Sequence, residues 1–238
     1  MGSSSPDSAP AVAGESLSAL LIDFGGVLTT PISDAFGALG EEAGLAPGEA
    51  LSLLAGHEGA RTALREHEEG RLDDEGFEDA FAQAIVESGG RLAARGLLAR
   101  IGARMQLDEP MVELVREVRR RGVPVALVSN SLGRDCYAKV DLDELFDVTV
   151  ISGRVGVRKP SRRIYAMACD ELGLPPEQCV LVDDLEHNLA GAARLGISGI
   201  LHREADGTAA RVRDLLGLPA SPAPMTTPTK DGSDVRPQ

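Results

Sequence analysis

The chain has 238 residues, of which 43% are hydrophobic and 26% charged, and its formal net charge is −13 at pH 7. This length is sufficient for one globular core with a substantial insertion. The negative charge argues against nucleic acid or an anionic membrane as the main partner. Only 3% of the residues are aromatic and none is tryptophan, which argues against a base-stacking platform. No apolar stretch reaches the roughly 18 residues that a membrane span requires.

The two ends of the chain differ in composition from the rest. Residues 1–16 are rich in Ser, Ala, Pro and Gly, and residues 219–238 form a polar, Pro-rich tail, so we expect both to be disordered. The first 16 residues lack the basic region and apolar core of a secretory signal. The three cysteines have no metal-like spacing. We therefore expect a cytoplasmic protein in a reducing compartment.

The first apolar run, residues 19–22, shows no alternation and predicts a buried parallel strand. Asp23 follows it directly, at the strand end where open α/β sheets place their ligands. Gly25 and Gly26 come next and allow a tight turn close to a bound group. Alone this motif is weak, because many α/β proteins carry an aspartate at a strand end.

Residues 31–105 do not alternate between strand and helix patterns. They favour helices interrupted by glycines, and we interpret them as an inserted helical cap domain. The glycines expected to break these helices are Gly40, Gly44, Gly56, Gly70, Gly89 and Gly90. The segment has 14 acidic residues against 7 arginines, a balance of −7. Most of this charge is typical of a solvated surface, but it would disfavour polyanionic substrates unless specific arginines counter it.

Strand and helix patterns alternate from about residue 108 onward. Helices are predicted over residues 111–121, 161–172, 185–195 and 208–216, and strands over 123–128, 148–151, 179–182 and 199–202. This order predicts an α/β fold with a doubly wound, Rossmann-like parallel sheet. We expect this core to comprise residues 17–30 and 106–218.

Three further polar clusters follow apolar strands or precede a helix. They are Ser129-Asn130, Lys159 before a proline, and the pair Asp183-Asp184. Each has an ordinary explanation: a turn, an exposed loop lysine, or a helix cap. Four such accidents in one order are improbable, and a parallel sheet brings strand ends together. The sequence therefore predicts one site at the carboxyl edge of the sheet.

With these four motifs in this order, the chain resembles the haloacid dehalogenase superfamily, and specifically its phosphatases with a helical cap. The resemblance covers roughly residues 17–217. It implies that Asp23 is a nucleophile that forms an aspartyl-phosphate, and that Lys159 neutralises it and binds the phosphoryl oxygens. Ser129 and Asn130 would donate hydrogen bonds to the transferring group.

The resemblance also implies a Mg²⁺ site. Its ligands would be the Asp23 carboxylate, the Gly25 carbonyl and Asp184, with Asp183 beside them, because Mg²⁺ favours oxygen ligands. Asn188, one helical turn after Asp184, would orient the loop.

Gly25 departs from the superfamily pattern, in which an aspartate at this position protonates the leaving group and later activates water. Loss of such a general acid and base typically lowers the rate 10²–10⁴-fold. Three explanations stay open: a substrate whose leaving group needs little protonation, such as an acyl or anomeric phosphate; a substitute from the cap, namely His57, Glu58 or His67; or loss of hydrolysis.

The leading hypothesis is accordingly a Mg²⁺-dependent phosphatase acting on a small phosphorylated metabolite. The second is a catalytically weak relative that binds a phosphorylated ligand or partner, which Gly25 favours. The third is a 2-haloacid dehalogenase, against which the paired Asp183-Asp184 argues because that branch needs no metal. The sequence leaves both a monomer and a homodimer open.

Overall fold

The computed structural model describes residues 17–219, and the segments expected to be disordered lie outside this range apart from residue 219. Five parallel strands form one sheet in the order β3-β2-β1-β4-β5. The strands are β1 (Ala19–Ile22), β2 (Val125–Ser129), β3 (Val148–Ile151), β4 (Cys179–Asp183) and β5 (Ser198–Leu201). The predicted doubly wound α/β fold is confirmed.

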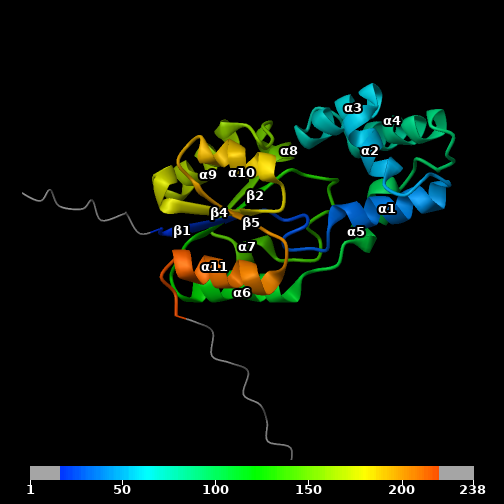
Figure 1. Ribbon diagram of the computed structural model, residues 1–238. Helices are drawn as coiled ribbons and strands as arrows, with labels where there is room; N and C mark the ends of the chain where they lie inside the picture. Colours follow the sequence, from blue (N-terminus) through cyan, green and yellow to red (C-terminus); the bar gives the residue numbers. More distant parts are fainter. Residues whose placement is uncertain (1–16, 220–238) are drawn as a thin grey trace, which may run out of the picture.

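Helices cover both faces of this sheet (Figure 1). Leu20 and Ile22 of β1 point to the face packed by α6 (Glu109–Arg120) and α11 (Ala205–Leu215). Leu21 points to the face packed by α9 (Arg162–Leu172) and α10 (Glu186–Ala193). Because both faces are covered, β1, β2 and β4 are buried at every position, which explains their unbroken apolar runs. Three short elements complete the core: α7 (Leu142–Leu145), α8 (Ser152–Val155) and the 3₁₀ helix η1 (Pro176–Gln178).

The core helices begin and end at recognisable residues. Asp108 caps α6 by accepting a hydrogen bond from the Met111 amide at 3.1 Å, and Ser161 caps α9. Gly173 ends α9 in the left-handed conformation at φ 68°, which glycine adopts at low cost. The helices and strands expected after residue 108 are present, with ends displaced by at most three residues.

Between β1 and α6 the chain forms a helical insertion, residues 32–104, with a hydrophobic cluster of its own. Its helices are α1 (Ile32–Ala43), α2 (Glu49–Gly56), α3 (Glu58–Glu68), α4 (Asp74–Glu87) and α5 (Leu97–Arg104). Gly44 and Gly70 have positive φ and lie at helix ends. The expectation that Gly40 breaks a helix is wrong, because it lies buried inside α1. A Cβ there would lie 3.1 Å from that of Ala50, so this glycine allows α1 and α2 to pack closely.

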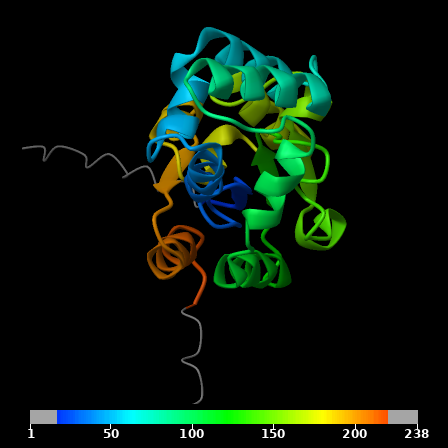
Figure 2. The ribbon, with the colours of Figure 1, turned by 90° about the vertical axis from the view of Figure 1, so that its right-hand side faces the viewer.

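The chain enters and leaves the insertion through two neighbouring segments. Thr29 and Leu107 form an antiparallel bridge, and the Thr30 amide donates to the Gln106 carbonyl at 2.8 Å. Figure 2, viewed from the insertion side, shows the insertion in front of the sheet, with α6 and α11 side by side below it. None of the helices in residues 17–219 is long and apolar enough to cross a membrane.

Candidate active site

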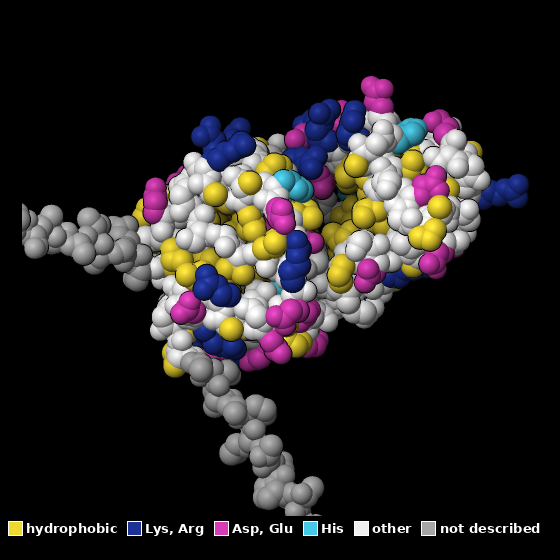
Figure 3. Space-filling model, viewed as in Figure 1, with side chains coloured by type: hydrophobic (Ala, Val, Ile, Leu, Met, Phe, Trp, Pro, Cys, Tyr) yellow, Lys and Arg dark blue, Asp and Glu magenta, His cyan; other side chains and the backbone are white. Residues whose placement is uncertain are grey.

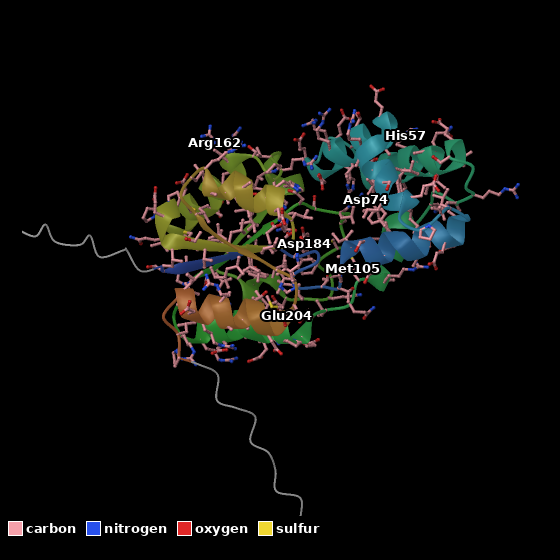
Figure 4. All side chains as sticks on the ribbon, viewed as in Figure 1. His57, Asp74, Met105, Arg162, Asp184 and Glu204 are labelled. Carbon is pink, nitrogen blue, oxygen red and sulfur yellow. The ribbon has the colours of Figure 1, made fainter. Side chains whose placement is uncertain are left out.

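The predicted polar clusters meet at the carboxyl edge of the sheet. Asp23 follows β1 and Asp183 ends β4, and these two strands are adjacent. Strand order reverses direction here, since the chain runs from β1 outward to β3 and then returns to β4. Such a switch point is where doubly wound sheets bind ligands. Figure 4 shows Asp184 at the side of the core that faces the insertion.

Lys159 lies at the centre of this cluster. Its side chain is 1% exposed, and its Nζ lies 2.7 Å from Asp23 Oδ1 and 2.8 Å from Asp183 Oδ2. A buried ammonium must be paired with opposite charge, and here two carboxylates provide it. The explanation of Lys159 as an exposed loop lysine is therefore wrong.

The cluster has more negative than positive charge. Burial raises the pKa of Asp23 to about 7; Lys159 opposes this shift, and Asp183 and Asp184 add to it. Burial alone would lower the pKa of Lys159, but the charges of Asp23 and Asp183 outweigh it and raise that pKa. Burial and Asp183 also raise the pKa of Asp184. One lysine therefore leaves the carboxylates undercompensated.

The two adjacent aspartates have different surroundings. Asp183 Oδ1 accepts hydrogen bonds from the Leu185 amide at 3.0 Å and from Asn188 Nδ2 at 2.9 Å, and its Oδ2 pairs with Lys159. Asn188 thus holds Asp183 in place. Asp184 caps no helix, since α10 begins without a side-chain cap, and within residues 17–219 the hydrogen bond to its carboxylate comes from its own backbone amide. Its oxygens are therefore available to a ligand.

Oxygen atoms of Asp23, Asp183 and Asp184 all lie within 4.8 Å of one another. Three carboxylates in excess over one ammonium form a donor set of the kind that hard divalent cations prefer. Both hydrogen bonds to the Asp23 carboxylate that the structure contains, from Phe24 N and Lys159 Nζ, end on Oδ1. The other oxygen, Oδ2, accepts neither of these hydrogen bonds and is available as a nucleophile or metal ligand.

Ser129 and Asn130 have separate roles in the structure. The buried Tyr137 hydroxyl donates to Ser129 Oγ at 2.9 Å, and burial raises the pKa of Tyr137 far above its ordinary value, so it stays a donor. Asn130 contacts the backbone of Lys159 twice: Oδ1 accepts from the amide at 2.8 Å, and Nδ2 donates to the carbonyl at 3.3 Å. Asn130 therefore positions Lys159. Its predicted contact with substrate stays a prediction.

Gly25 and Gly26 lie beside the carboxylates for different reasons. A Cβ at Gly26, whose φ is +75°, would lie 2.5 Å from Asp184 Oδ2, so only glycine lets the backbone pass this carboxylate. A Cβ at Gly25 would lie 2.5 Å from Ile32 Cδ1 and 3.8 Å from Met105 Cε. The space that an aspartate side chain would need is therefore occupied by apolar side chains from the insertion.

Core and insertion meet along a seam. Arg158 Nε lies 2.8 Å from Glu68 Oε2, and Lys139 Nζ donates to the Gly102 and Met105 carbonyls. Burial raises the pKa of Glu68 to about 7, although Arg158 and Lys159 oppose the shift. Figure 3 shows hydrophobic side chains gathered on both sides of this seam. A cavity of about 320 Å³ opens along it.

The three candidate substitutes for the missing general acid differ in whether they line this cavity. His57 caps α3 and lies 2.9 Å from Glu87 within the insertion, on its outer part in Figure 4. Glu58 is exposed. His67 is buried, lines the cavity and lies 2.9 Å from Asp74, while its Nδ1 has no hydrogen-bond partner in residues 17–219. Among the three, only His67 lines the cavity.

Several residues of this site carry no sequence signal. Tyr137, Ile32 and Glu68 come from a loop and from helices with no motif around them. Their contacts with Ser129, Gly25 and Arg158 join positions 7 to 90 residues apart, and a single sequence does not encode which of its helices face one another.

The fold and its site define a class of hydrolase in which a strand-end aspartate, a buried lysine and an acidic pair converge. Residues 17–196 match the haloacid dehalogenase-like hydrolase family, and the chain belongs to it.

Among curated proteins, the phosphoserine phosphatase of Thermus thermophilus is 30% identical over 131 residues, which are 52% of this chain and 53% of that protein. The bifunctional epoxide hydrolase 2 of Rattus norvegicus is 28% identical over 133 residues, which are 53% of this chain and 24% of that protein. The matched region thus spans about half or less of these relatives.

Solved structures share the fold over most of the chain. A HAD family enzyme from Bacteroides thetaiotaomicron superposes with a TM-score of 0.63 at 20% identity, covering 84% of this chain and 100% of that one. The same enzyme in complex with magnesium and inorganic phosphate gives 0.58 at 21% identity, covering 79% and 94%. A dehalogenase gives 0.62 at 22% identity, covering 85% and 98%. At these identities the likeness shows the fold alone.

Proposed function

We propose that this protein is a Mg²⁺-dependent phosphatase that hydrolyses a small phosphorylated metabolite through an aspartyl-phosphate on Asp23. The observation that carries the proposal is the buried Lys159 ammonium, which bridges Asp23 and Asp183 beside the half-buried carboxylate of Asp184. The phosphoserine phosphatase relative and the magnesium and phosphate complex of a structural neighbour support the same class.

In the first step, Asp23 Oδ2 attacks phosphorus, and the bond from phosphorus to the leaving-group oxygen breaks. The product is an acyl phosphate on Asp23. In the second step, water attacks the same phosphorus, inorganic phosphate leaves and the carboxylate is restored. Lys159 Nζ and the Ser129 hydroxyl stabilise the charge on the phosphoryl oxygens. Tyr137 assists by donating to Ser129 Oγ, and the Ser129 proton, which is directed to the Asn130 carbonyl at 3.4 Å, would turn to the phosphoryl group.

The donor set fits Mg²⁺. Asp23, Asp184 and the Gly25 carbonyl would hold the ion, with Asp183 beside it fixed by Lys159 and Asn188. When bound, the ion supplies positive charge to the phosphoryl oxygens and relieves the repulsion among the carboxylates.

The apolar wall of Ile32 and Met105 beside Gly25 supports a particular substrate range. Neither Ile32 nor Met105 can protonate the leaving group, so phosphates with good leaving groups should react best. Acyl, anomeric and aryl phosphates meet that condition. The same wall is the observation that favours the second candidate, a protein that binds phosphorylated ligands without rapid turnover.

An assay with 4-nitrophenyl phosphate separates the candidates. With Mg²⁺ we expect steady phosphate release, which Asp23→Asn lowers at least 10³-fold and EDTA abolishes. Arg162→Gln, an exposed position on α9 away from the insertion (Figure 4), is the matched control and should retain the wild-type rate. No release from this activated substrate would exclude the phosphatase and favour the binding protein. Chloride release from 2-chloropropionate without metal would favour a dehalogenase.

A further inference from the structure

The cavity between insertion and core adjoins the proposed phosphoryl site. Tyr137, which contacts Ser129, forms part of its wall, and so does Ser131, two residues after Ser129. From the insertion side it is lined by the end of α3 and the start of α4, including His67, Asp73 and Asp74. A phosphomonoester bound at Asp23 would therefore project its leaving group into this cavity.

The acidic groups of the cavity are already engaged. Asp73 caps α4, with Oδ1 accepting from the Gly76 amide at 2.9 Å. Asp74 Oδ1 lies 2.9 Å from His67 Nε2, and its Oδ2 accepts from the Arg134 amide at 3.3 Å. Figure 4 shows Asp74 on the side of the insertion that faces the core. The charge of Asp73 is partly compensated by the N-terminal end of α4, and that of Asp74 by His67 and Arg134.

The basic groups of the cavity are less engaged. Arg154, at the end of the short helix α8, is exposed and forms no ion pair within residues 17–219. The Arg134 side chain is 84% exposed, and its one ion pair, with Asp74, is long at 3.9 Å. Arg154 is therefore the cation of this cavity that is free to pair with a ligand group, whereas the negative charge of Asp73 lies at the start of α4, where it caps the helix.

We propose that this cavity is the leaving-group pocket, and that Arg154, aided by Arg134, selects phosphomonoesters whose leaving group carries a carboxylate. The inference rests on the proposed phosphatase function and narrows its substrate class. A guanidinium binds a carboxylate by paired hydrogen bonds. A single negative charge fits better than a second phosphate, because a dianion would also face Asp73 and Asp74. The volume of about 320 Å³ suits a small organic acid.

The test uses two aryl phosphates that differ in one charge: 4-carboxyphenyl phosphate and its carboxylate methyl ester. Both have leaving groups that need little protonation, so Gly25 does not limit either. With Mg²⁺, wild-type kcat/KM should favour the free carboxylate about tenfold, mostly through KM. Arg154→Gln should bring this ratio close to one, and Arg154→Lys should give an intermediate ratio. Arg162→Gln should keep the wild-type ratio.

A wild-type ratio near one, or an unchanged ratio in Arg154→Gln, would overturn the inference. Binding to Asp23→Asn, measured by calorimetry, is the second arm and needs no turnover. If neither aryl phosphate is hydrolysed, the phosphatase proposal fails. Tighter binding of 4-carboxyphenyl phosphate than of its methyl ester would still support Arg154 as the residue that binds the carboxylate. A third ligand, 1,4-phenylene bisphosphate, tests the charge: tighter binding than the carboxylate would overturn the choice of a monoanion.

Discussion

The core and the insertion hold their charged residues in contrasting ways. In the core, Asp23, Asp183 and Lys159 are almost fully buried, and every polar atom of Lys159 has a partner. In the insertion, Arg100 and Arg104 form ion pairs with Glu42 at a partly exposed surface, where such pairs contribute little. The buried charged residues at the edge of the sheet are thus held in one geometry, whereas the insertion contributes apolar and exposed charged side chains around them.

The largest effect is expected at the centre of the core. Lys159→Met leaves Asp23 and Asp183 buried without a cation, which should lower the free energy of unfolding at pH 8 by about 3–5 kcal/mol. Urea unfolding measures it, with Arg162→Met as the exposed control. A loss below about 1 kcal/mol would mean that the carboxylates tolerate each other without Lys159.

The next largest effect is expected on the rate of hydrolysis, at the apolar wall of Ile32 and Met105 beside Gly25. Gly25→Asp combined with Ile32→Ala provides both an acid and the space for it, so hydrolysis of β-glycerol phosphate should rise about 10²-fold. Gly25→Asp alone should gain less, because Ile32 Cδ1 occupies the space. Ile32→Ala alone is the control for an enlarged pocket. Unchanged hydrolysis in the double variant would show that a missing acid does not limit the reaction.

Glu68, on the insertion side of the seam, should make stability depend on pH. Its pKa is about 7 in the folded protein against an ordinary value of 4.5. The folded state thus holds this proton more tightly, and stability falls as pH rises from about 4.5 to 7. Across that range Glu68→Gln should gain about 2–3 kcal/mol relative to wild type, measured by urea unfolding at pH 4.5 and pH 8. Glu58→Gln, on the same helix, is the control. An equal difference at both pH values would contradict this origin of the pH dependence.

The smallest expected effects are on stability, when alanine replaces one glycine in the core and one in the insertion. Gly26→Ala in the core adds a Cβ at positive φ and against Asp184, and should cost about 1–2 kcal/mol. Gly37→Ala in α1 of the insertion meets no atom within 4 Å, and should gain about 0.5–1 kcal/mol from helix propensity. Thermal unfolding of the two variants checks the opposite signs. Stabilisation by Gly26→Ala would show that the Asp184 side chain moves away from the added Cβ at little cost in free energy.

The core was largely predictable because its three central strands, β1, β2 and β4, are buried on both faces. Such strands are apolar at every position and end where a polar residue is tolerated, so Asp23, Ser129 and Asp183 mark the carboxyl edge of the sheet. The insertion was predictable only as helical. Gly40 inside α1 looked like a helix break because its role depends on the close approach of α2. The Ile32 wall and the Glu68–Arg158 pair depend on contacts across the seam, which residue periodicity does not specify.

The paired segments at Thr29 and Leu107 have an architectural consequence. Since the outgoing and returning chains are hydrogen-bonded to each other, the chain leaves the core and rejoins it at one place, between Thr30 and Gln106. A change in the length of the inserted segment would therefore leave the positions of the two connecting segments, and with them the strand register, in place. Variation in the insertion would thus change the walls beside Gly25 and of the cavity, while the carboxyl edge of the sheet keeps its arrangement.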